Sequence, residues 1–392
     1  MSDERVRELV RRASPPEEQA AQDRAWRVVE AAFERRAPSP TRRRIMRPAL
    51  AAAVAVCAAA FALTPPGEAV GEWISDAVRP ARAPSAPVLT SLPADGRLLV
   101  TANQAAWIVQ ADGSKRRLGH YDEAGWSPGG LFVVASRGRQ LTALEPGGTV
   151  RWTVARPSPV SHPAWSPDGF RIAYLSGGAV RVVAGDGTGD ARLAPGSSGV
   201  TPAWRPGAQH VLAHLDRSGQ IVVTQTDTGD GLWRVRPHGS PRQLIWSADG
   251  QRLVAIAAGG VEVFDSGGRA LGKIGVPNAT RTGAAAIHPS EHALALIRYS
   301  PLDGYSKVVR VNLDAGAGSQ RELFTGRGTF SDVAWSPDGG WVLVGWKDAD
   351  QWLFIRGARV GQIRAVSNLG RQFDPGGAGP TAFPRVSGWC CS

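Results

Sequence analysis

Histidine and cysteine are the side chains best suited to bind metals or to transfer protons, and both are sparse in this chain of 392 residues. The seven histidines stand at positions 120, 162, 210, 214, 238, 288 and 292. Two pairs are four residues apart, a spacing that brings side chains to one face on a helix but not on a strand. None of the spacings matches a zinc site, so we expect no bound metal and no other cofactor.

The cysteines number three, which is too few for a disulfide framework. Cys57 lies in an apolar run, where a thiol behaves as a small apolar side chain. Cys390 and Cys391 are adjacent and could form a vicinal disulfide in an oxidising compartment. The alternative is that they are two small residues of a closing strand, and the sequence leaves both open.

No set of residues predicts catalysis. We expect no serine nucleophile of the hydrolase type. Residues 143–152 (ALEPGGTVRW) resemble one quinoprotein repeat, in which glycine turns and a tryptophan dock neighbouring units. Because the pattern occurs once, we interpret it as docking and not as a pyrroloquinoline quinone site. The sequence therefore predicts a protein that is not an enzyme.

A five-residue motif recurs along the C-terminal three quarters of the chain. Trp165-Ser166-Pro167-Asp168-Gly169 returns as Trp335-Ser336-Pro337-Asp338-Gly339. Weaker copies begin at Trp126, Trp204, Trp246 (with Asp249 and Gly250), Ile287 and Leu92. From Trp126 the steps between copies are 39, 39, 42, 41 and 48 residues. A period near 40 is typical of the blades of a β-propeller.

The motif suits a tight turn between two strands. Proline fixes φ at the first central position of the turn, and glycine supplies the positive φ that reverses the chain. The chain holds 47 glycines and 29 prolines, enough for many such turns. A short apolar run, as expected for a buried strand, follows each copy: Leu98–Val100, Phe132–Val134, Ile172–Leu175, Val211–Ala213, Leu253–Ile256, Leu294–Ile297 and Val342–Val344.

Four strands in each repeat, and seven repeats, predict an all-β fold: a seven-bladed β-propeller over residues 91–392. We expect the recurring tryptophans to pack between neighbouring blades. The stretch that ends at Trp389 resembles the residues before each motif. We therefore expect the last strand to complete the first blade and to close the ring, which leaves no open edge there.

The motif Trp-Ser-Pro-Asp-Gly resembles the propeller repeats of the TolB family, which are also found beside prolyl-oligopeptidase domains. No Trp-Asp dipeptide occurs in the chain, which makes ordinary WD repeats a poorer match. TolB is a soluble periplasmic protein with an α/β domain before its propeller. This sequence has a different N-terminal part, so TolB's partners do not carry over.

Residues before the propeller predict a membrane anchor. Residues 1–44 contain two short amphipathic helical patterns, and 65–90 are a linker rich in proline and alanine. An uncharged, alanine-rich run within 45–64 is long enough for one transmembrane helix, and arginines precede it. Arginine on this side predicts a cytoplasmic N-terminus and an extracytoplasmic propeller. The alternative is a signal peptide cleaved near Ala60-Phe61-Ala62.

Charge and layout together predict a binding protein. The net charge is +11, and residues 1–47 contain 12 arginines against 8 acidic residues. Outside this tail no basic cluster is interleaved with aromatic residues, so we expect no nucleic acid partner. We expect a membrane-anchored, extracytoplasmic scaffold for a protein or cell-envelope ligand. The alternative is a single-pass sensor, because the layout resembles that of membrane anti-sigma factors. Residues 1–47 contain no His or Cys, which excludes the zinc-binding form of that family.

Overall fold

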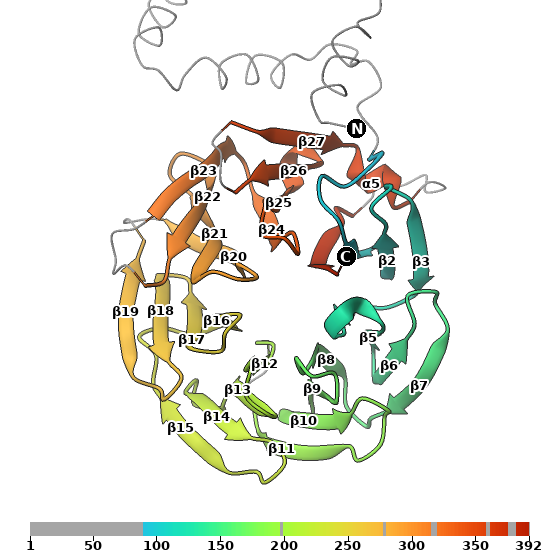
Figure 1. The fold of residues 1–392 in the computed structure, drawn as a ribbon, viewed down its shortest axis with the longest axis vertical. Coiled ribbons are helices and arrows are strands. Elements are labelled where there is room, and N and C mark those ends of the chain that lie inside the picture. The colour runs from blue at the N-terminus through green and yellow to red at the C-terminus, as the bar shows by residue number, and fades with distance from the viewer. Residues whose placement is uncertain are drawn as a thin grey trace, which may run out of the picture. The chain divides into compact units, whose positions relative to one another are not determined.

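Seven antiparallel sheets of four strands each surround a central axis (Figure 1). The structure is a computed structural model that describes residues 89–196, 199–276, 280–314, 320–357, 361–374 and 382–391. The seven-bladed propeller predicted from the repeats is confirmed. The predicted helical tail, the transmembrane segment and nearly all of the linker lie outside the described residues. No helix among the described residues is long and apolar enough to cross a membrane.

Each blade runs from an inner strand at the axis to an outer strand at the rim (Figure 1). Blades 1 to 3 contain, from the inside outwards, β28 (Arg385–Cys390), β1 (Arg97–Ala102), β2 (Ala105–Val109) and β3 (Lys115–Gly119); β4 (Glu123–Trp126), β5 (Val133–Arg137), β6 (Gln140–Leu144) and β7 (Val150–Ala155); and β8 (Val160–Trp165), β9 (Arg171–Ser176), β10 (Ala179–Ala184) and β11 (Ala191–Pro195).

Blades 4 to 7 have the same order. Their strands are β12 (Ala203–Trp204), β13 (Val211–Leu215), β14 (Ile221–Gln225) and β15 (Gly231–Val235); β16 (Pro241–Trp246), β17 (Arg252–Ala257), β18 (Gly260–Asp265) and β19 (Ala270–Gly275); β20 (Arg281–Ile287), β21 (Ala293–Ser300), β22 (Tyr305–Asn312) and β23 (Gln320–Arg327); and β24 (Phe330–Trp335), β25 (Trp341–Trp346), β26 (Gln351–Arg356) and β27 (Ile363–Ser367). Short helices lie at η1 (Pro128–Gly130), η2 (Lys347–Ala349) and α5 (Leu369–Gln372).

The C-terminal strand closes the ring. β28 pairs antiparallel with β1, with Leu98 opposite Trp389, so the first blade contains both ends of the propeller. The Trp389 indole N–H donates to the Asp95 carbonyl oxygen at 3.2 Å. The predicted closure is therefore confirmed. Pairing of this kind removes the free edge that an open ring would leave.

The core lies between the blades. The apolar runs that follow the motif form the second strands, and their side chains are buried on both faces of the sheet. Leu175, Trp204 and Leu212, for example, join blades 3 and 4 in one cluster. Burying a side chain such as Leu212 contributes roughly 1.5–3 kcal/mol. A second strand can therefore be apolar throughout, because blades cover both of its faces.

The serine and the aspartate of the motif hold the turn after the inner strand. In blade 3 the Ser166 hydroxyl donates to Asp168 Oδ1 at 2.5 Å and accepts the backbone N–H of Arg171 at 2.9 Å. Asp168 Oδ1 also accepts the N–H of Phe170. Gly169 takes φ 79°, the conformation predicted for the motif glycine. The same bonds form around Ser247 and Ser336.

Three of the recurring tryptophans join neighbouring blades by a hydrogen bond. The indole N–H groups of Trp204, Trp246 and Trp335 donate to the carbonyl oxygens of Ala164, Ala203 and Ala286 at 3.0–3.2 Å. Each acceptor stands one residue before the first motif residue of the preceding blade. Trp126 and Trp165 find no acceptor for their indole N–H among the described residues.

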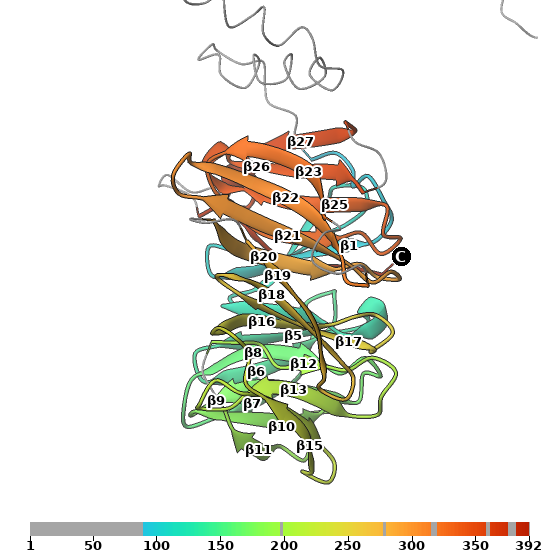
Figure 2. The ribbon, with the colours of Figure 1, turned by 90° about the vertical axis from the view of Figure 1, so that its left-hand side faces the viewer.

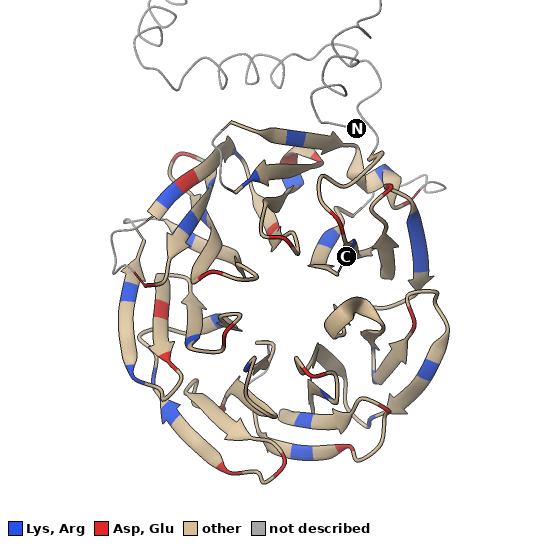
Figure 3. Ribbon diagram, viewed as in Figure 1, with Lys and Arg blue, Asp and Glu red and all other residues tan. Residues whose placement is uncertain are grey.

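The outer strands carry positive charge around the whole rim. Each of β3, β7, β11, β15, β19, β23 and β27 contains at least one lysine or arginine (Figure 3). A charged side chain discourages another strand from pairing with an exposed edge. The ring seen from the side shows the blades edge-on (Figure 2). The described basic residues are thus spread around the rim and do not gather in one sector.

Candidate ligand-binding site in the central channel

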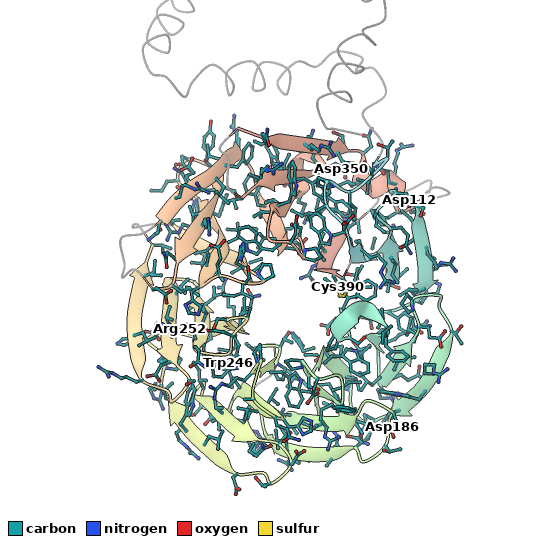
Figure 4. All side chains as sticks on the ribbon, in the orientation of Figure 1. Asp112, Asp186, Trp246, Arg252, Asp350 and Cys390 are labelled. Atoms are coloured by element: carbon teal, nitrogen blue, oxygen red, sulfur yellow. A yellow bond between two sulfur atoms is a disulfide. The ribbon has the colours of Figure 1, made fainter. Side chains whose placement is uncertain are left out.

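A channel runs along the axis of the ring. The inner strands enclose a cavity of about 920 Å³, to which residues of all seven blades contribute. The opening remains when the described side chains are drawn, with Cys390 close to its rim (Figure 4). Small side chains such as Ala124, Ala284 and Ser387 line much of the wall. The volume lies at the upper end of the range for small-molecule sites.

The two ends of the channel differ. The motif turns lie at one face of the ring, here called the motif face. The connections between blades lie at the opposite face, here called the loop face, where they bond to the hairpins between the second and third strands. For example, the Arg156 N–H donates to the Arg139 carbonyl oxygen, and that of Gly196 to Gly178. Each inner strand begins at the loop face and ends at the motif.

One position of the repeat lines the channel in every blade. It stands three residues before the first residue of the motif, or before Trp389 in blade 1, and is occupied by Glu123, His162, Thr201, Gln243, Ala284, Asp332 and Val386. The preceding position adds Asp122, Arg242, Gly283 and Arg385. The channel is therefore lined by a ring of residues that differ from blade to blade.

β-Bulges explain why several of these side chains enter the channel. The pairing of an inner strand with its neighbour shifts around His162 in blade 3, Arg242 in blade 5 and Asp332 in blade 7. A bulge leaves the extra residue unpaired and turns its side chain away from the regular pleat. His162 also takes φ 56°, a conformation that is uncommon for residues other than glycine and is often found at functional sites.

The acidic groups of the channel already bind donors of the chain. Asp122 Oδ2 accepts the backbone N–H of Gly138 at 3.1 Å. Glu123 accepts the backbone N–H of His162, and its other oxygen lies 3.8 Å from His162 Nδ1. Asp332 Oδ2 accepts a hydrogen bond from the Ser331 hydroxyl at 2.8 Å. The carboxylates are thus held in place by their own neighbours.

Asp332 is the most buried of these acids. Its side chain is 10% exposed, and burial raises the pKa of its carboxyl group above the ordinary value. The Ser331 hydroxyl and the Arg385 guanidinium act in the opposite direction. Arg385 Nε lies 3.8 Å from Asp332 Oδ1, which is an ion pair at long range and not a hydrogen bond.

The two arginines of the channel keep their hydrogen-bond donors free. The side chain of Arg385 is 78% exposed, and its one described partner is the distant Asp332 carboxylate. Arg242 is exposed and donates to no acceptor among the described residues. They stand on blades 1 and 5, on separate walls of the cavity. The channel therefore contains carboxylates that are already hydrogen-bonded and two guanidinium groups whose N–H donors are available to a ligand.

Two histidines outside the channel join neighbouring blades at the motif face. His210 of blade 4 lies between Asp168 of blade 3 (Nε2 to Oδ2, 3.0 Å) and Asp227 of its own blade (Nδ1 to Oδ2, 2.5 Å). Arg171 of blade 3 reaches the same Asp227 at 3.3 Å. We call this set of four residues a histidine clamp. In this clamp the hydrogen bond between His210 and Asp227 lowers the pKa of the Asp227 carboxyl group.

A second histidine clamp joins blades 5 and 6. His292 lies 2.7 Å from Asp249 Oδ2 and 2.8 Å from Asp314 Oδ2, and Arg252 reaches Asp314 at 3.0 Å. His210 and His292 occupy the same place in the repeat, directly before the second strand. Within the described residues no group of three or more His, Cys, Asp or Glu could hold a metal ion.

The other residues that the sequence singled out, the C-terminal cysteines and Trp152, lie at strand ends and between blades. Cys390 ends β28 and Cys391 follows it, with adjacent sulfur atoms, and the vicinal disulfide stays a prediction. Trp152 of the quinoprotein-like stretch donates its N–H to the Gly185 carbonyl oxygen of blade 3 at 2.9 Å, as expected for docking.

One spacing typical of hydrolases was missed in the sequence. Residues 125–129 (GWSPG) match the pattern Gly-x-Ser-x-Gly. Ser127 is 4% exposed, and its hydroxyl accepts the N–H of Phe132 at 2.8 Å inside the motif turn. A nucleophile elbow instead exposes its serine between a strand and a helix. The match is therefore a copy of the structural repeat.

The channel residues were missed for a different reason. They follow no motif of their own, and their types differ from blade to blade. Counting back three residues from the start of each motif would have found the position. The bulges that direct Arg242 and Asp332 into the channel had no evident signal in the sequence.

Comparisons with known proteins identify the fold and no more. No family model matches the chain, and no curated protein matches it. A chain of Kuenenia stuttgartiensis hydrazine synthase is 17% identical, with a TM-score of 0.49 over 59% of this chain and 75% of that one. A chain of the mitotic checkpoint complex is 16% identical, with a TM-score of 0.54 over 71% of this chain and 96% of that one.

The seven four-stranded sheets define the class: the described part of the chain is a seven-bladed β-propeller. In all, 1595 chains of solved structures match it. A fold shared so widely hosts many functions, so the site and not the fold must carry the functional conclusion.

Proposed function

We propose that this chain is a non-enzymatic binding scaffold that takes its ligand in the central channel. The observation that carries the proposal is the cavity of about 920 Å³ to which all seven blades contribute a channel-lining residue. A rigid ring with differing polar groups around one opening is suited to recognition. The ligand is a protein or a component of the cell envelope.

The chemistry of the channel supports binding more than catalysis. Among the described channel residues, Glu123 and His162 form one close pair of a carboxylate and an imidazole, and Glu123 accepts a backbone N–H. Ser127, the serine of the hydrolase-like spacing, is buried in a turn. Catalysis by acyl transfer needs a nucleophile within hydrogen-bond reach of a base. The described channel residues do not provide that arrangement.

The proposed location is the outer face of the cytoplasmic membrane. It is supported by the apolar run within 45–64, by the arginines before it and by the TolB-like repeat motif. A protease-accessibility assay on membranes from expressing cells, with a tag at each end, tests it. Loss of the C-terminal tag outside with survival of the N-terminal tag inside is expected. A propeller released without its N-terminal tag would contradict the anchor.

Binding in the channel can be tested in intact cells with a photoreactive amino acid. We expect a covalent adduct from position Ala284, which lines the channel, and none from Leu232, which is 51% exposed on the outer strand β15. Both positions are compared at equal expression. Adducts from Leu232 alone would contradict a channel site and indicate a ligand at the rim.

The layout also supports a second function, a single-pass sensor that signals through its N-terminal tail. The specific observation is the pair of helical patterns in residues 1–44 before the apolar run. The test is crosslinking from residues 1–44 on the cytoplasmic side. A specific cytoplasmic adduct that changes when the channel is occupied is expected, and its absence would leave the scaffold function alone.

A further inference from the structure

Blade 3 has the aspartate of a histidine clamp without its cations. Asp186 stands two residues after the third strand of its blade, the place that Asp227 and Asp314 occupy in blades 4 and 6. In both clamps this aspartate bonds an imidazole and a guanidinium. Asp186 Oδ1 accepts the N–H and the hydroxyl of Thr188 at 3.0 and 2.7 Å, and its Oδ2 accepts no hydrogen bond from a described residue.

Aromatic rings stand where the clamps have cations. Phe170 lies directly before the second strand of blade 3, at the position of the clamp histidine. Phe132 lies one residue before the strand partner of the motif tryptophan in blade 2, at the position of the clamp arginine. The motif of blade 2 also has Gly129 in place of the aspartate that bonds the histidine. Asp186 is therefore the one charged member of the clamp that the interface of blades 2 and 3 keeps.

These residues line a pocket of about 520 Å³ between blades 2 and 3. In it Phe132 stacks on Trp165 with ring centroids 6.3 Å apart. Trp152 is half-buried, and the Phe170 side chain is 66% exposed. Asp186 also lines the pocket and lies toward the rim of the ring, away from the central opening (Figure 4). No residue of this pocket lines the channel, so it is a separate site.

Four aromatic side chains beside one carboxylate select an organic cation. The face of an aromatic ring carries negative charge density and attracts a cation, and a neighbouring carboxylate adds to that attraction. The two arginines that line the pocket have carboxylates of their own: Arg151 bonds Glu145 at 3.2 Å, and Arg171 bonds Asp227 at 3.3 Å. Arg171 acts on Asp186 only at longer range. Asp186 is thus the carboxylate of the pocket that is available to a ligand.

The pocket has little to offer a cation that carries N–H groups. The Phe170 carbonyl oxygen already accepts the N–H of Gly185 and a guanidinium N–H of Arg171. The Gly185 carbonyl oxygen accepts the indole N–H of Trp152. A primary ammonium or a guanidinium would give up hydrogen bonds to water that these bonded groups do not replace. A trimethylammonium group has no N–H donor and presents methyl groups to the rings.

We propose that the pocket between blades 2 and 3 binds a trimethylammonium group, with its methyl groups against Phe132, Trp165 and Phe170 and its charge beside Asp186. The inference goes beyond the proposed binding function of the channel and does not depend on it.

The test uses the full-length protein in dodecyl maltoside, with radiolabelled choline as the probe. Equilibrium dialysis should show saturable binding of choline. The neutral molecule of the same shape, 3,3-dimethylbutan-1-ol, should compete at least about tenfold less well, because it lacks the attraction of the rings and of the carboxylate. Competition by glycerophosphocholine identifies the source of the group: stronger competition than by unlabelled choline indicates a lipid headgroup, and weaker competition indicates a free solute.

Two substitutions at exposed positions test the residues. Asp186→Asn keeps an acceptor for Thr188, removes the charge and should weaken choline binding by about two- to fivefold, as expected for a partly exposed ion pair. Phe170→Leu keeps an apolar side chain, removes the ring and should give a loss of about two- to fivefold. Phe170→Tyr, which keeps a ring, should bind as the unaltered protein does. Circular dichroism of each variant separates loss of binding from loss of fold.

Asp112→Asn is the matched control. Asp112 lies in the turn between the third and fourth strands of blade 1, and its Oδ1 accepts the N–H of Ser114 at 2.9 Å. It does not line the pocket. Its substitution removes the same charge and should change the affinity by less than about 1.5-fold, because salt screens a distant charge.

Four results would overturn the inference. Equal competition by choline and by 3,3-dimethylbutan-1-ol would show an apolar pocket without preference for a cation. Equal losses from Asp112→Asn and Asp186→Asn would reduce the binding to attraction by net charge. Choline binding that both Asp186→Asn and Phe170→Leu leave unchanged would belong to another site, and the absence of saturable choline binding would remove the ligand altogether.

Discussion

The tryptophans of the repeat allow a direct test of what holds neighbouring blades together. Trp204 and Trp165 are the motif tryptophans of adjacent blades, but the indole N–H of Trp204 donates to Ala164 at 3.0 Å, whereas that of Trp165 has no described acceptor. Replacing each by phenylalanine keeps an aromatic ring and removes the N–H. The two substitutions should therefore have unequal costs.

The magnitude follows from the groups that are lost. Trading an indole for a phenyl ring removes roughly 40 Å² of buried apolar surface at the buried Trp204, about 1 kcal/mol, and less at the half-buried Trp165. In Trp204→Phe the buried carbonyl of Ala164 also loses its donor, which costs about 1–3 kcal/mol more. In Trp165→Phe an unpaired donor disappears, and the ring can keep its stacking on Phe132. We expect Trp204→Phe to be worse by about 1–3 kcal/mol.

Denaturant unfolding of the full-length protein in detergent, followed by circular dichroism, measures the difference. Trp335→Phe serves as a replicate, because its N–H donates to Ala286 at 3.0 Å. Unchanged m-values are required for the comparison, since a change would indicate altered cooperativity. Equal free energies of unfolding for Trp204→Phe and Trp165→Phe would show that the interblade hydrogen bond contributes nothing and would refute the reasoning.

Three further predictions concern the clamps, the channel and the closure. Hydrogen bonds to Asp249 and Asp314 raise the pKa of His292, so its stabilisation is complete below about pH 6.5 and is lost as the pH rises through the folded-state value. Because its partners are nearly half exposed, the loss should be at most about 1 kcal/mol, and His292→Gln should abolish it in unfolding measured between pH 5 and 9. Burial raises the pKa of Asp332, so the folded state holds that proton more tightly and stability should fall as the pH rises from about 4; Asp332→Asn should flatten this slope, and an unchanged slope would assign it to another group. Deleting residues 382–392 should abolish the cooperative thermal transition, because β1 loses β28, while a Cys390→Ser, Cys391→Ser double variant should keep it.

The fold could be predicted because its determinants are local and repeated. Each motif supplies its own turn: the bonds that hold it join Ser166 and Asp168 to each other and to the backbone N–H groups of Phe170 and Arg171. Such interactions join residues that are close in the sequence. Because the motif occurs seven times, its period is visible although some copies are degenerate. The closure by β28 could be predicted for the same reason, since the stretch before Trp389 resembles its counterparts.

The channel and the clamps depend on contacts that the local pattern does not record. Asp168 and His210 are 42 positions apart, and they meet because blades 3 and 4 pack side by side in the ring. The sequence showed His210 and His214 as a pair, but His210 pairs with Asp168 of the neighbouring blade, whereas His214 is buried beside Thr224. Spacing along a strand could not separate these roles.

Repetition itself indicates where recognition must lie. Residues of the turn, such as Ser166 and Asp168, recur because every blade needs the same reversal of the chain. The position three residues before the motif lines the channel, and in some blades its side chain also bonds the next blade: Glu123 accepts the backbone N–H of His162, and the Gln243 amide bonds the backbone of Ala285. Its residue type nevertheless differs from blade to blade, as Glu123, Asp332 and the alanine in blade 6 show. A ring of identical blades would be symmetric and could not distinguish one orientation of a ligand from another. The differing residues break that symmetry, which is what a site that binds a ligand in one orientation requires.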